Sequence, residues 1–543
     1  MSEVTDTDAR QDPASVAAGS LARQAAWRPD HPAVVEAWGG RVLRYEELDR
    51  RSRALAAALV RRGLGPGSTV AMALRNGATW FEVAWALQRL GAYWVPVNWH
   101  LTAGEASYLV QDAGAQALVV DAELAELAHA ASAVLEPPAL RVAAGGPLEG
   151  FFDLAALTAE DPAGSPELEG QAMLYSSGTT GRPKGIRRPL SQAPFGQRTT
   201  LDGLLQVLYR AGPDSVYLSP APLYHAAPLG FTMAAHRLGA TVVVMDRFDP
   251  RGWLEAVARY RVTHSQVVPT MLVRLLELPE EVRGSFDLSS LQVVVHAAAP
   301  CPVEVKRRAM AWLGPILHEY YAGSEGNGFC AIGPEEWLAR PGSVGRPVAG
   351  AVHIVGPDGE ELPPGEVGTI YFEGSPPFEY HRDPERTRAA FHPRGWSTLG
   401  DLGYLDQDGY LYLSDRRTDL VITGGVNVYP REVEEVLVEH PAVADAAVVG
   451  APDPDLGKRV VAVVELRPDH APGDDLAGEL TRFCRERLAG YKCPREIRFV
   501  PALPRTPTGK LLRRRLVEEL WPTPPTEGPP TAGPTGGGAG AAG

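Results

Sequence analysis

The sequence predicts an α/β protein built on mostly parallel, helix-covered sheets, followed by a smaller β-rich region and a compact α+β unit. Helical and strand patterns alternate in the opening region and again near residues 214–330, which is typical of parallel sheets. Turn-rich β-like segments follow, and then a new group of strands with a helix. A chain of 543 residues also exceeds the size at which one hydrophobic core keeps growing, so we expect at least two domains.

The first elements show clear periodicity. Apolar residues at helix spacing over 45–59 predict an amphipathic helix, and the apolar run 68–74 predicts a buried strand after a Gly-Pro-Gly turn. The same alternation returns over 214–330, where apolar runs at 241–245 and 291–295 follow helical stretches. Mostly parallel sheets covered on both faces explain this pattern best.

The sequence pattern changes over 343–415, where Pro-Asp-Gly, Pro-Pro-Gly and Asp-Gln-Asp-Gly turns separate short β-like segments. This favours a β-rich subdomain with a boundary near Asp415. Beyond it, apolar runs at 446–450 and 460–466 precede a helical pattern over 476–488, which describes a compact α+β unit. About a hundred residues can fold as a domain.

These patterns divide the chain into four parts. We expect a flexible N-terminus at 1–19, a large N-terminal domain at 20–415, a C-terminal domain at 416–521 and a disordered tail at 522–543. The tail is almost entirely Pro, Thr, Gly and Ala, a composition that cannot offset its ordering entropy by burial.

Composition excludes several classes. A formal charge of -14 disfavours nucleic-acid binding as the main task. Cys301, Cys330, Cys484 and Cys493 form no CxxC pair, so neither a disulfide framework nor a zinc site is indicated. The N-terminus lacks a signal-peptide pattern, and no apolar run approaches the roughly 18 to 20 residues of a transmembrane helix. We therefore expect a cytoplasmic protein with no nucleic-acid partner and no transmembrane segment.

Residues 175–185, TyrSerSerGlyThrThrGlyArgProLysGly, are rich in phosphate-binding groups. Glycines let backbone N–H groups approach an anion, hydroxyls donate to its oxygens, and a lysine adds charge. The expected ATP- or AMP-binding residues are Ser176, Ser177, Gly178, Thr179, Thr180, Gly181 and Lys184. The segment is not a Walker A loop, because Pro precedes the lysine and Gly follows it.

The whole string resembles the phosphate-binding signature of the adenylate-forming superfamily, which includes acyl-CoA synthetases, peptide-synthetase adenylation domains and firefly luciferase. Further elements match in family order from about residue 20 to 520, most closely as in bacterial fatty-acyl-CoA ligases. The resemblance implies an N-terminal AMP-binding domain of two helix-covered sheets with a β-rich subdomain, and a small mobile C-terminal domain. It also implies ATP, Mg²⁺ and coenzyme A.

On the acyl side, ProLeuTyrHis at 222–225 resembles the family's aromatic-histidine step, which implies that His225 borders the reacting carboxylate as a catalytic residue. HisAlaAlaAlaProCysPro at 296–302 resembles the small-residue segment that lines the acyl and adenine sites. The residues expected at the acyl pocket are His225, Gly230, Ala297, Ala298 and Ala299.

On the nucleotide side, GluTyrTyrAlaGlySerGlu at 319–325 resembles the family's YGxTE element, with Ala322 a departure. The match implies that Tyr320 and Tyr321 bind the nucleotide, with Tyr321 against adenine. By the same match Ser324 contacts phosphate and Glu325 holds Mg²⁺ as a catalytic residue. A carboxylate accepts two hydrogen bonds in parallel, and by resemblance Asp401 accepts both ribose hydroxyls.

Residues 415–430 resemble the family's hinge and glycine loop. The resemblance implies that Arg416 and Asn427 bind the nucleotide and that Gly424 and Gly425 border coenzyme A. Thr418 stands at the hinge position, where the family usually has Lys or Asp. Separately, 503–516 match the terminal PxTxxGK element, whose catalytic lysine is Lys510.

The implied activity is a two-step ligation: a carboxylic acid, fatty or otherwise apolar, reacts with ATP to give acyl-AMP, and coenzyme A then takes the acyl group. Transfer to a carrier-protein thiol, or a reaction that stops at the adenylate, is the alternative. A more distant one is an α/β-hydrolase using Ser324 with His225 or His318, although the nucleophile elbow is imperfect. A nucleotide-binding protein without activity fits poorly, because all the catalytic positions are filled. The acid and the oligomeric state stay open.

Overall fold

The computed structural model describes residues 21–176, 183–299, 301–416, 419–423, 426–453, 457–488, 490–506 and 511–521. Their contacts form two compact units, and the chain passes from the first to the second between Leu420 and Val421. Residues 505 and 506 group with the first unit, and residues from Leu511 onward with the second. The expected boundary at Asp415 lies within strand β22 (Leu411–Arg416) of the first unit.

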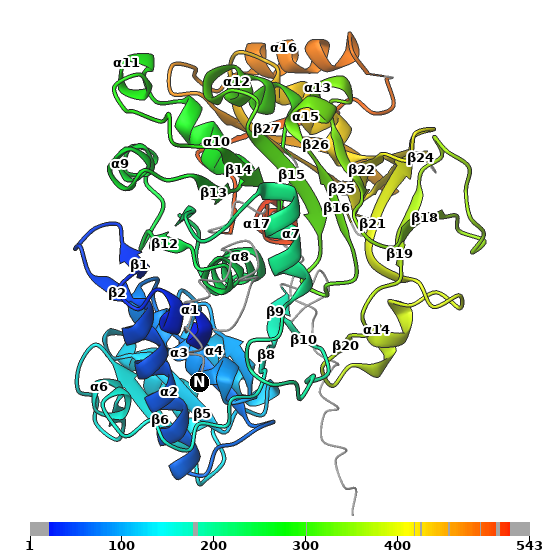
Figure 1. Ribbon diagram of the computed structural model, residues 1–543. Helices are drawn as coiled ribbons and strands as arrows, with labels where there is room; N and C mark the ends of the chain where they lie inside the picture. The colour runs from blue at the N-terminus through cyan, green and yellow to red at the C-terminus, as the bar shows by residue number, and fades with distance from the viewer. Residues whose placement is uncertain are drawn as a thin grey trace, which may run out of the picture. The chain divides into compact units, whose positions relative to one another are not determined.

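The first unit contains two large sheets. The first of them is parallel, with the order β7-β6-β5-β3-β4-β8 (blue and cyan in Figure 1). Its strands are β3 (Thr69–Ala73), β4 (Tyr93–Pro96), β5 (Ala117–Asp121), β6 (Leu140–Ala144), β7 (Phe152–Asp153) and β8 (Gln171–Ala172). Its helices are α2 (Tyr45–Arg61), α3 (Ala78–Arg89), α4 (Ala103–Asp112), α5 (Ala125–Ala133) and α6 (Leu154–Thr158), with a short 3₁₀ turn at Ala122–Leu124.

Alternate residues of these strands enter two different cores. Met72 and Val119 pack in the cluster that contains residues of α2 and α3, whereas Ala71 and Leu118 pack with residues of α4 and α5. Side chains alternate between the two faces of a strand, so a strand apolar at every position needs helices on both sides. This explains why the apolar run predicted at 68–74 forms a central strand.

The second sheet of this unit has the order β18-β19-β21-β22-β17-β16-β15-β14-β13-β11-β12-β1-β2. Its parallel part comprises β1 (Pro32–Glu36), β11 (Val216–Ser219), β12 (Thr241–Val244), β13 (His264–Val267), β14 (Val293–His296) and β15 (Leu317–Ala322), with β2 (Val42–Arg44) antiparallel at the edge. Strand β1 pairs with β12 through Val34 and Val242, far apart in sequence.

Helices cover both faces of this parallel part. They are α1 (Leu21–Trp27), α7 (Thr200–Tyr209), α8 (Ala226–Arg237), α9 (Pro250–Tyr260), α10 (Pro269–Leu276), α11 (Glu280–Arg283), α12 (Val303–Leu313) and α13 (Pro334–Ala339). Phe231 of α8 shares a core with Val295 and Tyr320, whereas Trp253 of α9 shares the opposite core with Val294. The helix-covered α/β architecture predicted from the sequence is confirmed.

The β-rich region continues the same sheet. Strand β16 (Phe329–Ile332) turns back antiparallel on β15, and β17 (Ser343–Pro347) joins it to β22. Strands β18 (Ala351–Val355), β19 (Gly368–Glu373) and β21 (Ser397–Leu405) complete the antiparallel end. A small sheet of β9 (Leu174–Ser176), β10 (Lys184–Arg187) and β20 (Glu379–Tyr380) lies in the same unit, with α14 (Pro384–Ala389) after it.

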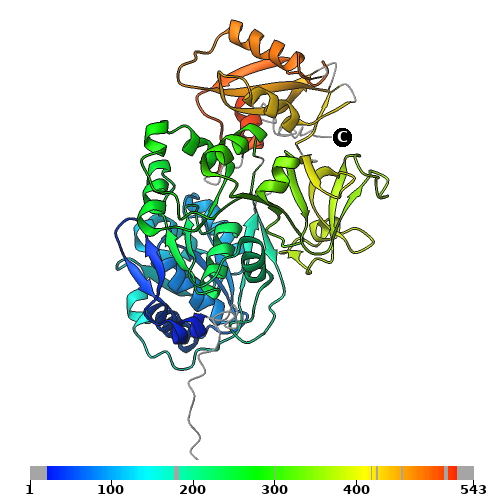
Figure 2. The ribbon, with the colours of Figure 1, turned by 45° about the horizontal axis from the view of Figure 1, so that its top comes forward.

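The second unit contains the sheet β25 (Val443–Asp453), β26 (Gly457–Leu466) and β27 (Glu496–Val500), and the pair β23 (Val421–Thr423) and β24 (Val426–Val428). Its helices are α15 (Pro430–Val438), α16 (Asp474–Arg485) and α17 (Arg513–Leu520). Val448 packs on one side of the sheet with Leu480 of α16, the orange helix of Figure 2, and Val449 packs on the other with Leu516 of α17. The predicted α+β character is confirmed.

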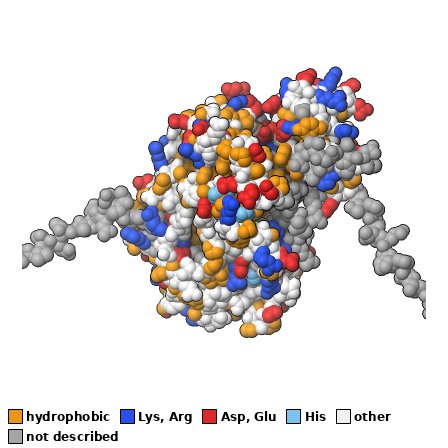
Figure 3. All heavy atoms as spheres, turned by 90° about the vertical axis from the view of Figure 1, so that its right-hand side faces the viewer, with side chains coloured by type: hydrophobic (Ala, Val, Ile, Leu, Met, Phe, Trp, Pro, Cys, Tyr) orange, Lys and Arg blue, Asp and Glu red, His pale blue; other side chains and the backbone are white. Residues whose placement is uncertain are grey.

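Two further observations concern membrane-spanning helices and the distribution of charge on the surface. Among the described residues, no helix combines the length and the apolar character needed to span a bilayer. Acidic and basic side chains are interspersed with hydrophobic ones on the face drawn in Figure 3.

Candidate functional site

Two predicted nucleotide-binding residues meet at the end of the parallel part of the second sheet. Tyr321 lies near the end of strand β15, and Asp401 lies in β21 of the antiparallel end. The Tyr321 hydroxyl donates to Oδ2 of Asp401 at 2.7 Å, and Asp401 is only 7% exposed. The hydrogen bond fixes the orientation of this carboxylate.

Glu325, the predicted metal ligand, follows β15 in a short loop and is 8% exposed. Its Oε1 accepts a hydrogen bond from the Tyr380 hydroxyl at 2.9 Å. Burial, together with the charge of Glu325, raises the pKa of Tyr380, so this phenol stays a hydrogen-bond donor at neutral pH.

Glu325 suits Mg²⁺ because that ion is usually held by one or two carboxylates together with phosphate oxygens and water. A dedicated cage of three side chains is not needed, and none occurs among the residues that the structure describes. The donor set is therefore compatible with Mg²⁺ that arrives with ATP.

Arg188 is a charged neighbour of Glu325 that the sequence did not single out. It directly follows β10, and its Nη1 lies 2.7 Å from where a Cβ on Gly326 would be. Gly326 has a φ of 67°, so both its backbone and this guanidinium favour glycine there. Burial lowers the pKa of Arg188 and the Glu325 carboxylate opposes this. The local sequence pattern does not show which of the two adjacent arginines, Arg187 or Arg188, lies near Glu325. The guanidinium of Arg187 lies 4.4 Å from the centre of the Tyr93 ring instead.

The predicted phosphate-binding segment is bracketed by a β-hairpin. Ser176 of β9 pairs with Lys184 of β10, and Lys184 Nζ lies 3.5 Å from Oδ2 of Asp383. The side chain of Ser176 lies outside the described residues. So do the other predicted phosphate-binding residues between the two strands, which are Ser177, Gly178, Thr179, Thr180 and Gly181.

On the acyl side, His225 immediately precedes helix α8, and its ring centroid lies 4.6 Å from that of Tyr224. Helix packing requires glycine at position 230, in addition to the predicted role at the acyl pocket. A Cβ there would come within 2.9 Å of Leu201 Cδ2 in helix α7. Its missing side chain allows the two helices to pack closely.

The predicted small-residue segment follows strand β14. Ala297 is buried, whereas Ala298 is exposed and has a φ of 74°. A left-handed backbone costs a non-glycine residue roughly 1–2 kcal/mol, and such strain is concentrated at functional sites. Ala299, the third residue of the segment, is partly buried.

Several other predicted residues are not described. Lys510, Thr418, Gly424 and Gly425 lie outside the described residues. Arg416 in β22 and Asn427 in β24 are described for their backbone alone. Ser324 is partly buried in the loop before Glu325. The roles assigned to all these residues stay predictions.

The hydrolase alternative finds no geometric support. Among the described residues, no hydrogen bond joins Ser324 to His318. His318 packs edge-on against Tyr209 with ring centroids 5.4 Å apart. Burial, aided by the charge of Lys306, lowers its pKa to about 4, which suits a core histidine better than a general base at neutral pH.

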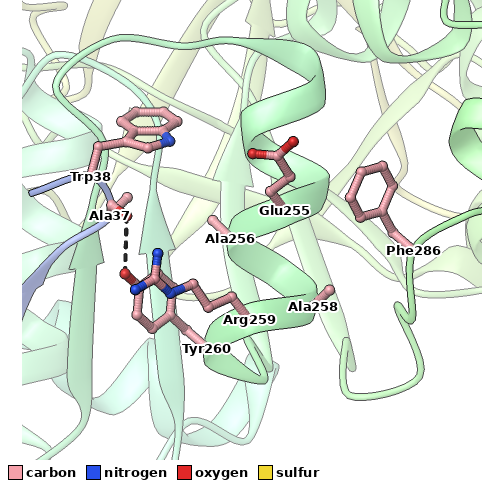
Figure 4. A pocket seen from close by; sticks show the side chains of 8 residues that line it. All are labelled: Ala37, Trp38, Glu255, Ala256, Ala258, Arg259, Tyr260 and Phe286. Carbon is pink, nitrogen blue, oxygen red and sulfur yellow. Dashed lines mark hydrogen bonds between the residues drawn. The ribbon is translucent and has the colours of Figure 1, made fainter. Parts of the chain in front are cut away.

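A separate pocket of about 450 Å³ lies between helix α9 and the residues after β1 (Figure 4). Trp38, Arg259 and Tyr260 contribute to its wall, and the Tyr260 hydroxyl donates to the carbonyl oxygen of Ala37 at 3.0 Å. Helix α9 covers the face of the sheet opposite to α8. This pocket contains none of the predicted site residues.

Known proteins are similar to this chain in sequence and in fold. The chain matches the model of the AMP-binding enzyme family over residues 21–378 and that of the AMP-binding enzyme C-terminal domain over 432–510. It is 33% identical to a fatty acid–acyl-carrier-protein ligase, ScoC, of Streptomyces coeruleorubidus, covering 91% of this chain and 94% of that protein. It is 36% identical to a feruloyl-CoA synthase of an Amycolatopsis species, covering 88% and 93%.

Among solved structures, the o-succinylbenzoate coenzyme A synthetase of Bacillus subtilis in complex with AMP is similar with a TM-score of 0.75. The two share 30% identity over 91% of this chain and 97% of the other. With both domain models matched, relatives covered almost end to end, and Tyr321, Glu325 and Asp401 gathered in one unit, the chain belongs to the AMP-binding enzyme family and is an AMP-forming acid–thiol ligase.

Proposed function

We propose that this ligase joins an acid to coenzyme A in two steps, with Mg-ATP as the energy source. In the first, a carboxylate oxygen attacks the α-phosphorus of ATP, the bond to the β-phosphate oxygen breaks, and pyrophosphate leaves. In the second, the thiol sulfur of coenzyme A attacks the acyl carbon, its proton is lost to solvent, and AMP leaves. The hydrogen bond from Tyr321 to Asp401 is the observation that carries the proposal, because it pre-positions a carboxylate for a ribose.

The described residues have distinct roles in the first step. Asp401, held in place by Tyr321, receives ribose hydroxyls, since a carboxylate can accept several hydrogen bonds. Glu325 holds Mg²⁺, which supplies positive charge against the phosphate oxygens. Lys184 and Arg188 add cationic groups at the end of the phosphate segment, where charge grows as pyrophosphate departs.

The second step depends on parts of the chain that are known here from sequence alone. We propose that Lys510 acts in adenylation and that rotation about the segment containing Thr418 then brings Gly424 and Gly425 to coenzyme A. Such a rotation would gate the reaction without contributing chemistry of its own. A cytoplasmic location, where ATP and coenzyme A are available, fits this activity.

Similarity to ScoC supports a second candidate, in which a carrier-protein thiol accepts the acyl group. The two candidates share the first step and differ only in the acceptor. Coenzyme A dependence therefore discriminates between them.

The test is release of AMP and pyrophosphate from Mg-ATP with fatty, aryl and other apolar acids, each with and without coenzyme A. Turnover that requires coenzyme A supports the first candidate. Pyrophosphate release unaffected by coenzyme A, with stable acyl-AMP, supports transfer to a carrier protein. Absence of pyrophosphate release with every acid would contradict both.

A further inference from the structure

A buried polar cluster lies beside the predicted acyl residues, on the face of the sheet that α7 and α8 cover. It contains Tyr209 at the end of α7, Tyr217 in β11, Gln266 in β13 and Tyr320 in β15. All four are at most 7% exposed. Phe231, next to Gly230 in α8, packs against the same cluster, so these polar groups sit in an otherwise apolar core.

Tyr320 is held rigidly by aromatic rings on both sides. Its ring is stacked on Phe231 at 5.6 Å and 20°, and on Phe329 at 4.8 Å and 10°. Two stacked neighbours leave the phenol no alternative rotamer without displacing one of them. The Tyr320 hydroxyl therefore occupies a fixed position.

The hydrogen-bonding capacity of this cluster is only partly used. Gln266 Nε2 donates to the Tyr320 hydroxyl oxygen at 2.7 Å, and Tyr217 donates to Gln266 Oε1 at 3.5 Å, the outer limit of a hydrogen bond. The hydrogen of the Tyr320 hydroxyl then has no acceptor among the described residues. Whichever way the Gln266 amide lies, one capacity of that hydroxyl remains.

Tyr209 adds a second unused hydrogen-bonding group to the cluster. It is 2% exposed, and its hydroxyl has no hydrogen-bond partner among the described residues. Burial raises the pKa of Tyr209, and the neighbouring Tyr320 raises it further, so the two phenols lie close together. A buried hydroxyl without a partner costs about 1–3 kcal/mol, so a cluster with two unused capacities favours a polar atom that is supplied from outside.

The distance along helix α8 sets the size of the ligand. His225 immediately precedes that helix and Phe231 is six residues further on, a rise of about 9 Å at 1.5 Å per residue. If the acid's carboxylate lies at His225, its far end reaches the cluster when the acyl group is about 9 Å long.

We propose that the acid activated by this enzyme carries a hydrogen-bonding oxygen about 9 Å from its carboxylate, and that Tyr320, positioned by Gln266 and the two phenylalanines, recognises this oxygen. The class comprises acids with a hydroxyl, ether or carbonyl oxygen at the far end, in preference to simple hydrocarbon chains. The proposal rests on the proposed function, since it assumes that the acid lies along α8.

The test uses 4-hydroxycinnamate, 4-methylcinnamate and octanoate as probes, with kcat/KM measured from AMP release in the presence of Mg-ATP and coenzyme A. The first two acids have the same shape and differ by hydroxyl against methyl. We expect the wild-type enzyme to favour the hydroxyl acid at least about tenfold, because a site built to bond an oxygen rejects the analogue that lacks it.

Tyr320→Phe should bring the ratio of the two cinnamates close to one, and Tyr209→Phe should lower it less. Any effect of Tyr320→Phe on nucleotide binding cancels in this ratio, and a thermal midpoint confirms that the variant is folded. Tyr404→Phe, which removes a hydroxyl from the ring stacked on Tyr412 in the antiparallel end, is the matched control. It should leave the ratio unchanged.

Two results would overturn the inference while the ligase function stands: equal or better turnover of octanoate and 4-methylcinnamate by the wild type, or a hydroxyl preference that survives in Tyr320→Phe. Failure of all three probes together with every acid of the wider panel would instead contradict the proposed function.

Discussion

The Tyr321 hydroxyl donates to Oδ2 of Asp401 at 2.7 Å, across 80 residues of sequence. The bond joins the end of the parallel strands to the antiparallel end of the same sheet, and it holds a nearly buried carboxylate that we propose as the ribose-binding group.

Tyr321→Phe should therefore weaken nucleotide binding without loss of fold. A hydrogen bond to a charged group contributes about 1.5–3 kcal/mol, so we expect the KM for ATP to rise roughly tenfold or more. Steady-state kinetics at saturating acid measure this, with Tyr404→Phe as the control. An unchanged KM would show that Asp401 needs no positioning.

Glu325→Gln should raise the Mg²⁺ concentration required for half-maximal adenylation. The amide keeps the shape of the side chain and still accepts a hydrogen bond from Tyr380, but it lacks the charge that a hard cation requires. A Mg²⁺ titration at fixed ATP checks this, with the exposed Glu255→Gln as control. Superimposable titrations of wild type and Glu325→Gln would refute the metal role.

Arg188→Gln should raise the inhibition constant for pyrophosphate about tenfold, because a charge-assisted contact to phosphate is lost. Arg188→Lys should recover part of the effect. The neighbouring Arg187→Gln is the matched control, since that guanidinium lies over the Tyr93 ring. Product inhibition of Arg188→Gln that equals that of the wild type would place this guanidinium away from the phosphates.

Lys510→Ala should abolish most adenylate formation and spare thiolysis of supplied acyl-AMP. This lysine supplies charge to the first step alone, by the matched PxTxxGK element. Pyrophosphate release and coenzyme A-dependent AMP release from acyl-AMP measure the two steps separately. Arg515→Ala is a suitable control, because Arg515 is exposed and bonds Glu519 one helical turn away. Equal loss in both assays would contradict the assignment.

His236 should make the fold sensitive to acid. It is fully buried, accepts a hydrogen bond from Trp85 Nε1 on Nδ1, and lies with Nε2 3.0 Å from the carbonyl oxygen of Ala33. Burial lowers its pKa to about 4. Because the unfolded chain binds this proton more readily, the stabilisation is present above pH 6.5 and is lost as pH falls towards 4, by roughly 3 kcal/mol in total.

Thermal midpoints between pH 7 and pH 4 check this expectation. His236→Gln should be less stable at pH 7 but should lose less stability on acidification, whereas the exposed His129→Gln should follow the wild-type curve. An equally steep curve for His236→Gln would assign the acid sensitivity to other groups.

Local periodicity accounts for much of what could be predicted from the sequence. The run at 68–74 became β3 and the pattern over 476–488 became α16 at Asp474–Arg485, each within a few residues. Their apolar spacing reflects contacts made within one element and its immediate layer, which a single sequence records directly.

Contacts between distant segments could not be read in this way. The expected β-rich subdomain proved to be an extension of the second sheet, because β17 pairs with β16 on one side and with the distant strand β22 on the other. Likewise, the position of Arg188 beside Glu325 depends on a loop that returns more than a hundred residues later. Hydrogen-bond partners across such separations leave no periodic trace in the chain.

The pairing of β1 with β12 has a consequence for synthesis on the ribosome. Val34 emerges early, but its partner Val242 follows about 200 residues later. At about 5–20 residues per second, the first strand waits roughly 10 to 40 s for its place in the sheet. The sheet of β3 to β8 is complete well before then. We therefore expect β1 to remain without its β12 partner on the nascent chain and to be a binding site for chaperones.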